Sequence, residues 1–320
     1  MKKVMTTLLV SLFSAQLWAG ASMGKVDSFA ALEKTVTALK SPTSTLLVMD
    51  DDDTLTMMAC PEGAAAADCQ YLGGPAWFSW QQSLLGTDSP YRVAGSFNEL
   101  LDIANVLFAL NRMSYTDQNI YPVLSKLSGS GVRLLVETAR GDANLNATEQ
   151  QFALLGDSSG QGSGQGSGQG NLLQLLASNS LKIWSGRQPG LAAPGLPCHI
   201  PGTRDVTFQN GIYYLGGQNK GVMLACLLIQ FEQGNLFEPS LPISHIVFID
   251  DTLENVQDVY DYFRDSSRYQ VTALHYTALE KHKAALTKGP KSQGLQDMAN
   301  SRWQALQSAM KANLVSPIVR

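Results

Sequence analysis

Two clusters of aspartates have the residue types and the spacing that chemistry requires. The apolar run Leu46–Met49 is followed at once by four acids, Asp50–Asp53, and then by Thr54. A second apolar run, Ile246–Ile249, is followed by the pair Asp250–Asp251. Carboxylates packed this closely repel one another unless a cation lies nearby, and carboxylate oxygens are the ligands that Mg²⁺ prefers. The alternatives are a solvated turn or a calcium site, although a calcium loop of the EF-hand type spaces its acids differently.

Two further segments add a hydroxyl and an ammonium group. Val132–Val136 is a third apolar run, and Glu137 and Thr138 follow it. Lys220 follows the glycine-containing stretch 216–219 and precedes an apolar helical run. Both a hydroxyl and an ammonium group can donate hydrogen bonds to anionic oxygens. Either residue alone would most often be ordinary, so they are informative only together with the two acidic clusters.

The elements that must position these residues are short buried strands that alternate with helices. Strands are predicted at 45–49, 132–136 and 246–249, with a weaker one at 182–184, and helices at 97–109, 121–127, 256–263 and 279–314. Short, continuously apolar strands between amphipathic segments are typical of an α/β fold with a doubly wound parallel sheet. Ligands of such sheets bind beyond the carboxyl ends of the strands, which is where the acids, the threonine and the lysine are expected.

Taken in order, the four segments resemble the sequence motifs of the haloacid dehalogenase (HAD) superfamily. Asp50–Leu55 (DDDDTL) resembles the D-x-D-x-T-L motif, and Thr138 resembles the hydroxyl residue that follows the second strand. Lys220 matches the lysine ahead of the last strand, and Asp250–Asp251 matches the closing acidic pair. The likeness spans roughly residues 45–276. It implies a HAD-like Rossmannoid core within residues 22–320, a small, mostly helical cap inserted at about 60–115, and a helical C-terminal appendage.

The resemblance also implies a role for each matching residue. Asp50 would be the nucleophile that forms an aspartyl-phosphate, and Asp52 would protonate the departing alcohol and then activate water. Thr138 and Lys220 would bind the phosphate. The cofactor would be Mg²⁺, held by Asp50, the backbone carbonyl of Asp52 and the pair Asp250–Asp251, with Asp251 the better ligand and Asp250 its neighbour.

Four neighbouring residues have no role in this pattern or depart from it. Asp51 and Asp53 are expected to face solvent or to lie behind the metal ligands. Asn255 stands where many members of the superfamily carry another acid. Arg140 is expected either to touch the substrate or to pair with surface acids.

The N-terminus has the pattern of a secretory leader. Lys2 and Lys3 precede an apolar stretch that ends at Trp18, and Ala19–Ala21 offers a cleavage site of small residues. Residues 1–21 are therefore predicted to be a signal peptide, and the mature protein is expected to be exported, either periplasmic or secreted.

Export would permit disulfides among the four cysteines. The short separation of Cys60 and Cys69 favours a bridge between them, whereas for Cys226 a plain buried thiol is an equal interpretation. The stretch 158–170 repeats glycine, serine and glutamine without an apolar residue and is predicted to be a flexible loop.

The composition gives no support to a nucleic acid as a binding partner. The net charge is −4, and no stretch rich in lysine and arginine could neutralise a nucleic-acid backbone. No membrane association is expected after leader cleavage, and the expected partner is a small phosphorylated substrate. The predicted function is an exported Mg²⁺-dependent phosphatase that hydrolyses a phosphate monoester. The alternatives are a phosphotransferase of the same fold, or a HAD-fold interaction or effector protein with incidental catalysis.

Overall fold

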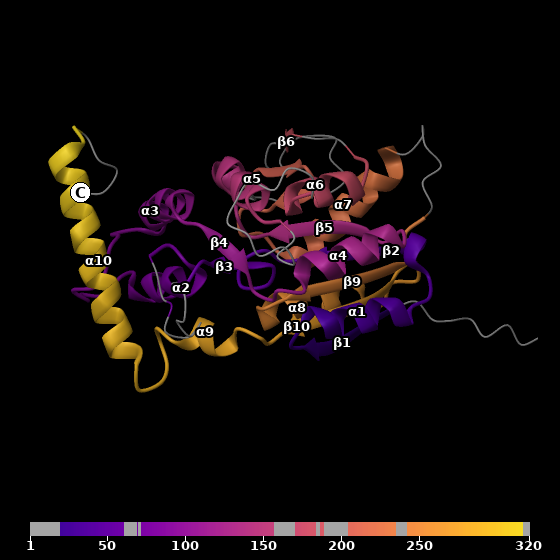
Figure 1. Cartoon of the computed structure of the whole chain (residues 1–320), viewed down its shortest axis with the longest axis horizontal. Coiled ribbons are helices and arrows are strands. Elements are labelled where there is room, and N and C mark those ends of the chain that lie inside the picture. The colour runs from indigo at the N-terminus through magenta and orange to yellow at the C-terminus, as the bar shows by residue number, and fades with distance from the viewer. Residues whose placement is uncertain are drawn as a thin grey trace, which may run out of the picture.

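A computed structural model describes residues 20–60, 69, 72–156, 170–183, 186–188, 204–234 and 242–315. Within these residues, the larger part of the molecule contains one eight-stranded sheet in the order β1-β10-β9-β2-β5-β8-β7-β6 (Figure 1). The strands are β1 (Gly20–Val26), β2 (Thr45–Met49), β5 (Arg133–Thr138), β6 (Gly186–Gln188), β7 (Val206–Gln209), β8 (Ile212–Tyr214), β9 (His245–Asp250) and β10 (Gln270–Tyr276). The neighbouring strands β1, β10, β9, β2, β5 and β8 pair in parallel. The last two strands are antiparallel, because β7 pairs antiparallel with both β8 and β6.

Helices cover both faces of this sheet. The central strand β2 is apolar and buried along its whole length, because side chains on both of its faces meet helices. One face packs against α7 (Lys220–Gly234) and α8 (Leu253–Phe263). The other face packs against α1 (Phe29–Ala38), α4 (Ile120–Gly129), α5 (Leu145–Ala153) and α6 (Leu172–Asn179). The predicted α/β class, with a mostly parallel sheet between helices, is confirmed.

A smaller helical lobe lies at one end of the sheet. It consists of α2 (Pro75–Leu84), α3 (Phe97–Leu110) and α10 (Ser292–Asn313), which share one apolar core (Figure 1). The antiparallel ribbon of β3 (Thr56–Met58) and β4 (Met113–Tyr115) forms the base of the segment that carries α2 and α3. The short helix α9 (Glu280–Ala284) leads from β10 back to the lobe.

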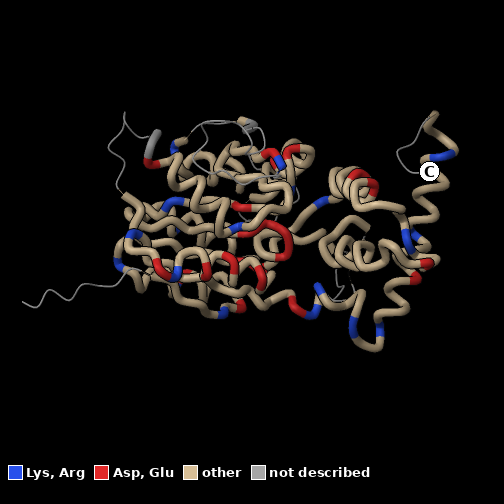
Figure 2. The backbone as a smooth tube through the Cα atoms, turned by 180° about the vertical axis from the view of Figure 1, so that it is seen from behind, with Lys and Arg blue, Asp and Glu red and all other residues tan. Residues whose placement is uncertain are grey.

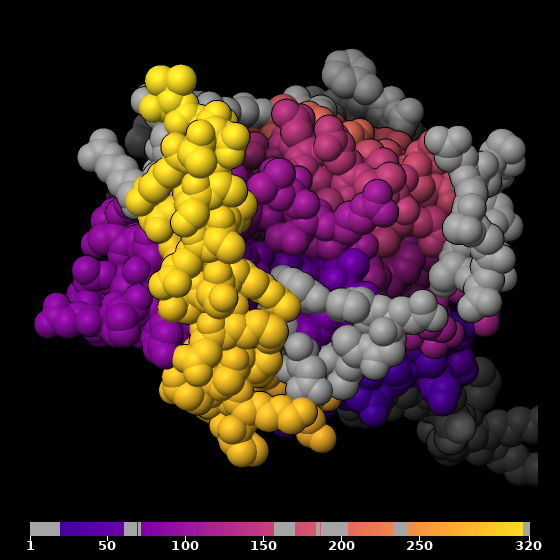
Figure 3. Space-filling view, turned by 60° about the vertical axis from the view of Figure 1, so that its left-hand side comes forward, coloured from indigo at the N-terminus to yellow at the C-terminus, as the bar shows by residue number. Residues whose placement is uncertain are grey.

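The C-terminal helix is an integral part of this lobe. Leu295, Ala299 and Trp303 of α10 are buried, and they belong to the same core as Trp77 and Trp80 of α2. Figure 3 shows α10 lying along the surface of the lobe. The lobe is therefore built from two segments far apart in the sequence, and the predicted helical appendage does not stand apart from the rest.

One strand prediction is wrong. In the predicted strand 182–184, Lys182 and Ile183 form no strand, and Trp184 lies outside the described residues. The place beside β5 is taken by β8, in which Ile212 pairs with Val136. The reason is burial, because all three residues of β8 are fully apolar or aromatic and buried, whereas Lys182 is exposed.

The last two residues of the predicted signal peptide, Gly20 and Ala21, belong to strand β1. β1 begins at Gly20, and both Gly20 and Ala21 pair with β10. Cleavage after Ala21 would therefore remove the first two residues of an edge strand. Residues 1–19 and, except for Gly170, the predicted flexible loop 158–170 lie outside the described residues. Among the described helices, none combines the length and the apolar character needed to cross a membrane.

The cysteine predictions are decided by the structure. Cys60 and Cys69 form a disulfide whose Cα atoms are 5.6 Å apart, as their short separation predicts. Cys226 is also disulfide-bonded, so its interpretation as a plain buried thiol is wrong. Its partner lies outside the described residues.

Candidate active site

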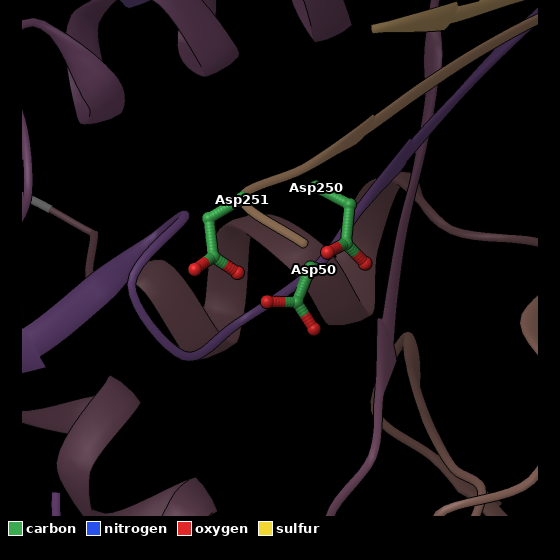
Figure 4. Close-up of side chains that lie close together, drawn as sticks. All are labelled: Asp50, Asp250 and Asp251. Atoms are coloured by element: carbon green, nitrogen blue, oxygen red, sulfur yellow. The ribbon is translucent and has the colours of Figure 1, made fainter. Parts of the chain in front are cut away.

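The carboxyl ends of β2 and β9 bring the two acidic clusters together. Met49 of β2 pairs with Ile249 of β9, so the residues that follow them leave the sheet side by side. One carboxylate oxygen from each of Asp50, Asp250 and Asp251 lies within 4.8 Å of the others (Figure 4). Figure 2 shows the continuous acidic stretch at the junction between the sheet and the helical lobe.

Lys220 forms hydrogen-bonded ion pairs with two of these acids, Asp50 and Asp250. Its Nζ donates hydrogen bonds to Oδ1 of Asp50 and, at 2.6 Å, to Oδ2 of Asp250. The side chain is only 1% exposed and stands at the first residue of α7. The next residue, Gly221, packs so tightly on α8 that a Cβ there would overlap the carbonyl oxygen of Asp258. This close approach of the two helices fixes the lysine over the strand ends.

The two acids of the second cluster have different surroundings. Asp250 accepts hydrogen bonds from Lys220, from the backbone N–H of Thr252 (2.8 Å) and from Asn255 Nδ2 (3.0 and 3.1 Å), so both of its oxygens are engaged. Asn255 thus holds Asp250 instead of supplying a further acid. Asp251 lines the cavity described below, and the hydroxyl of Thr54 accepts a hydrogen bond from its backbone N–H (3.0 Å). Asp251 also accepts hydrogen bonds, from Lys283 Nζ at 2.9 Å and from the hydroxyl of Thr252 at 3.3 Å, but unlike Asp250 it lines the cavity. That Asp251 is the better metal ligand stays a prediction.

Burial and mutual repulsion raise the pKa values of the carboxyl groups in this cluster. Burial, together with the negative charges of Asp250 and Asp52, raises the pKa of Asp50 to about 7, although Lys220 opposes this shift. Burial and the charge of Asp50 also raise the pKa of Asp251, against the opposing effect of Lys283. A divalent cation would supply the positive charge that these groups lack. The all-oxygen set of donors fits Mg²⁺.

Asp52 is held by Arg140. The guanidinium donates from Nε and Nη2 to the two oxygens of Asp52, at 2.8 and 2.7 Å. Its Nη1 lies 2.7 Å from Oδ2 of Asp51 and donates to the hydroxyl of Thr148 at 2.9 Å. The arginine is 7% exposed, and it stacks over the ring of Phe108 with 3.7 Å between its Cζ and the ring centroid. Arg140 therefore pairs with acids of the site and not with surface acids, and the expectation that it touches the substrate stays a prediction.

Asp51 and Asp53 do not face solvent, so that part of the prediction is wrong. They are 0% and 1% exposed because the chain turns back on itself after Asp50. The backbone carbonyl of Asp51 accepts hydrogen bonds from the N–H groups of Leu55 and Thr56, both at 2.9 Å, and Asp53 has a φ of +60°. Asp51 also accepts a hydrogen bond from the hydroxyl of Thr56 at 2.7 Å. Burial raises the pKa of Asp51 to about 7 and that of Asp53 well above its usual range.

Thr138 ends β5 at the same edge of the sheet. It is fully buried, and its Oγ1 accepts a hydrogen bond from the backbone N–H of Arg140 at 3.2 Å. The hydroxyl proton is not needed for that contact, so it can be donated to another acceptor. Thr138 is not among the residues that line the cavity described below, so its role in binding phosphate stays a prediction.

A cavity of about 670 Å³ separates the strand ends from the helical lobe. Asp50, Asp52, Arg140 and Asp251 line it on the side of the sheet. On the opposite side it is lined by apolar side chains of α2 and α3, namely Phe78, Phe97, Leu101, Ala104 and Phe108. The candidate nucleophile and acid therefore open into a space large enough for a small organic molecule.

One protein-family profile, described as a protein of unknown function (DUF2608), matches residues 25–316. The chain belongs to the DUF2608 family. No curated protein and no solved structure matches it. The family match begins near the end of β1 and includes both acidic clusters and the α10 helix that completes the lobe, so the whole site belongs to the DUF2608 segment.

Sequence reasoning assigns no role to two residues of the DUF2608 site. Lys283 of α9 donates a hydrogen bond to Oδ2 of Asp251 at 2.9 Å and another to the hydroxyl of Thr252. Glu137 is fully buried behind Thr138, and burial raises its pKa well above the usual range. The role of Lys283 depends on how α9 crosses the strand ends, and no local pattern at that lysine reveals this.

Proposed function

We propose that this DUF2608 protein is a Mg²⁺-dependent phosphatase of the HAD superfamily that hydrolyses a phosphate monoester through an aspartyl-phosphate on Asp50. The observation that carries the proposal is the ammonium group of Lys220, bound to Asp50 and Asp250 where three carboxylates converge. Burying such an ion pair costs about as much desolvation energy as its attraction returns, so fold stability alone does not account for it. A lysine that neutralises both a nucleophile and a phosphate does account for it.

The nucleophile and the acid have separate roles in the proposed reaction. A carboxylate oxygen of Asp50 attacks phosphorus, and the bond between phosphorus and the ester oxygen breaks. Asp52 gives its proton to the departing alcohol and then takes a proton from the water that attacks the aspartyl-phosphate. Inorganic phosphate leaves, and both aspartates return to their starting state.

The surrounding residues orient the phosphate. Thr138 donates its hydroxyl to a phosphate oxygen, and Lys220 offsets the negative charge that nucleophile and phosphate bring together. Mg²⁺ held by Asp50, Asp251 and the backbone carbonyl of Asp52 would neutralise further charge between them. Asp250 remains the partner of Lys220 and, unlike Asp251, is not among the residues that line the cavity.

The resting protein keeps Asp52 in an ion pair with Arg140. A general acid must carry a proton, so the bidentate contact has to loosen when a substrate binds. The ring of Phe108, which belongs to the lobe, lies against the same guanidinium. A substrate that displaces Phe108 would therefore also shift Arg140 and weaken its ion pair with Asp52.

The proposal extends to the lobe and to the location of the protein. The lobe faces the strand ends across the cavity, as a HAD cap would, and we include the C-terminal helix α10 in that cap. The Cys60–Cys69 disulfide supports an exported protein, because disulfides persist mainly in oxidising compartments.

The test is a phosphatase screen of the purified protein with nucleotides, sugar phosphates and phosphopeptides, with Mg²⁺ and with EDTA. We expect release of inorganic phosphate that depends on Mg²⁺ and is lost in Asp50→Asn. Full activity in EDTA, or equal activity of Asp50→Asn, would rule out this mechanism. Adding an acceptor alcohol and looking for its phosphorylated product distinguishes hydrolysis from phosphotransfer.

A further inference from the structure

The helix α3 carries two apolar stripes, although its place in the lobe needs only one. Leu100, Ile103 and Leu107 are buried in the core shared with α2 and α10. A second stripe follows the helical spacing of four, three and four residues, and its members line the cavity: Phe97, Leu101, Ala104 and Phe108. The lobe core therefore accounts for the first stripe, whereas the second faces Asp50 and Asp52.

Phe97 and Phe108 supply two aromatic rings to this second stripe, and Phe78 of α2 lies beside it. Phe78 of α2 packs edge-on against Phe97, with ring centroids 6.2 Å apart and planes at 72°. The guanidinium of Arg140 lies over Phe108, and that of Arg204 lies 5.6 Å from the centroid of Phe97. These contacts hold the rings in place. A flat ring entering the cavity finds aromatic edges and faces that favour stacking.

The size of the cavity agrees with such an occupant. Its volume of about 670 Å³ far exceeds that of a phosphate group and lies within the range of sites for small organic molecules. The phosphate is to be bound at the strand ends, so the space below the lobe remains for the alcohol part of the ester. On the side of the lobe that space is bordered by the apolar side chains of α2 and α3, with Ser79 and Asn105 among them.

We propose that this cavity selects phosphate monoesters whose alcohol carries a planar apolar ring, with Phe97 as the main specificity-determining residue. The inference rests on the proposed phosphatase function and adds the substrate class to it. Phe97 is half-buried, lies on the stripe that faces the cavity and contacts both Phe78 and Arg204. Burial of a phenyl ring there should raise kcat/KM by roughly 10- to 100-fold.

The test compares 2-phenylethyl phosphate with ethyl phosphate in the intact protein with Mg²⁺. The two leaving alcohols have similar acidity, so a difference in kcat/KM reports contact of the ring with the cavity and not leaving-group chemistry. We expect the phenylethyl ester to be preferred by roughly 10- to 100-fold. In Phe97→Ala the preference should fall at least several-fold, and Phe97→Leu, which keeps the lobe filled, should fall between the two.

The matched control is Leu110→Ala. Leu110 lies on the same helix, is 69% exposed and belongs to neither stripe, so its replacement should leave the ratio of the two kcat/KM values unchanged. A ratio near one in the natural protein would overturn the inference. So would a ratio that Phe97→Ala and Phe97→Leu leave as it is.

Binding of the non-hydrolysable 2-phenylethylphosphonate and ethylphosphonate, measured by calorimetry, separates the two proposals. If both esters are hydrolysed at equal kcat/KM and both phosphonates bind equally, the phosphatase function stands and the cavity inference fails. If neither ester is hydrolysed but the phenylethyl compound binds more tightly, the phosphatase function fails and the preference of the cavity for a ring stands. Absence of both hydrolysis and binding would refute both.

Discussion

Replacing Arg140 by glutamine tests whether the buried acid Asp51 depends on that arginine. The guanidinium lies 2.7 Å from Asp51, which is fully buried and has the hydroxyl of Thr56 as its other side-chain partner. Arg140→Gln removes the positive charge and keeps a polar side chain of moderate size. It leaves the Asp51 carboxylate buried near Asp52 without the guanidinium group that pairs with both.

The expected loss is large compared with the stability of a typical domain. Removing one partner of a buried ion pair costs about 3–5 kcal/mol, against a free energy of unfolding of about 5–15 kcal/mol. Adding Asp51→Asn removes the stranded charge, so the double variant should recover about 2–3 kcal/mol relative to the sum of the single changes. At pH 5 the loss should shrink, because burial raises the pKa of Asp51 to about 7 and the carboxyl is then protonated.

The assay is urea denaturation in EDTA at pH 8 and pH 5, followed by circular dichroism. The control is Arg264→Gln, whose exposed side chain pairs with Asp261 and Asp265 at 3.4 Å and should change the free energy of unfolding by less than about 1 kcal/mol. Strict additivity of Arg140→Gln and Asp51→Asn would refute the coupling. A loss no larger than that of the control would refute the dependence itself.

Three further predictions concern the acids and the disulfide. With a natural ester, Asp52→Asn should slow turnover by about 10²–10⁴-fold, and p-nitrophenyl phosphate should restore part of the first step; equal turnover by Asp52→Asn and the natural protein would contradict this role. Burial raises the pKa values of Asp50 and Asp51 from near 3.8 to about 7, so between these pH values the unfolded chain holds fewer protons and the metal-free protein should lose stability as pH rises. The free energy of unfolding should fall by up to about 1.4 kcal/mol per pH unit for each group, and excess Mg²⁺ should remove most of the fall that is due to Asp50. A free energy of unfolding that stays constant in EDTA from pH 4 to 7, measured by urea denaturation, would count against this prediction. Non-reducing mass spectrometry of exported protein should find the Cys60 and Cys69 peptides linked, and free thiols at both positions would speak against the bridge.

The sheet and the convergence of the acids could be predicted because they depend on local patterns. Thr45–Met49 and Ile246–Ile249 are short and continuously apolar, which is typical of strands buried on both faces. The carboxyl ends of parallel strands lie at one edge of a sheet, and the resemblance to the HAD motifs implied that Asp50 and Asp251 meet there.

The surroundings of the acids could not be predicted because they depend on distant contacts. Arg140 is separated from Asp52 by 88 positions, and their pairing depends on how the turns after β2 and β5 face each other. Four consecutive acids normally favour solvent, and only the positive charge of Arg140 and the tight turn make burial of Asp51 tolerable. Sequence reasoning had neither contact to work with.

The packing of the C-terminal helix in the lobe could not be predicted either, because it too depends on distant contacts. Leu295, Ala299 and Trp303 recur at a helical spacing of four, so an apolar face on the C-terminal helix is readable from the sequence. The partner of that face is not readable, because α2 and α3 lie about two hundred residues earlier. The appendage was therefore predicted as a helix without its place in the lobe.

Direct detection of the phospho-enzyme tests the central claim. The Asp52→Asn variant, incubated with p-nitrophenyl phosphate and Mg²⁺ and quenched in acid, should accumulate a phosphoryl group because the second step lacks its base. Reduction of the acyl phosphate with borohydride, followed by peptide mass spectrometry, should place the modification on Asp50 and on no other aspartate of the cluster. Modification of Asp51 instead would shift the motif by one residue, and the absence of any acyl phosphate while p-nitrophenol is still released would contradict the proposed mechanism.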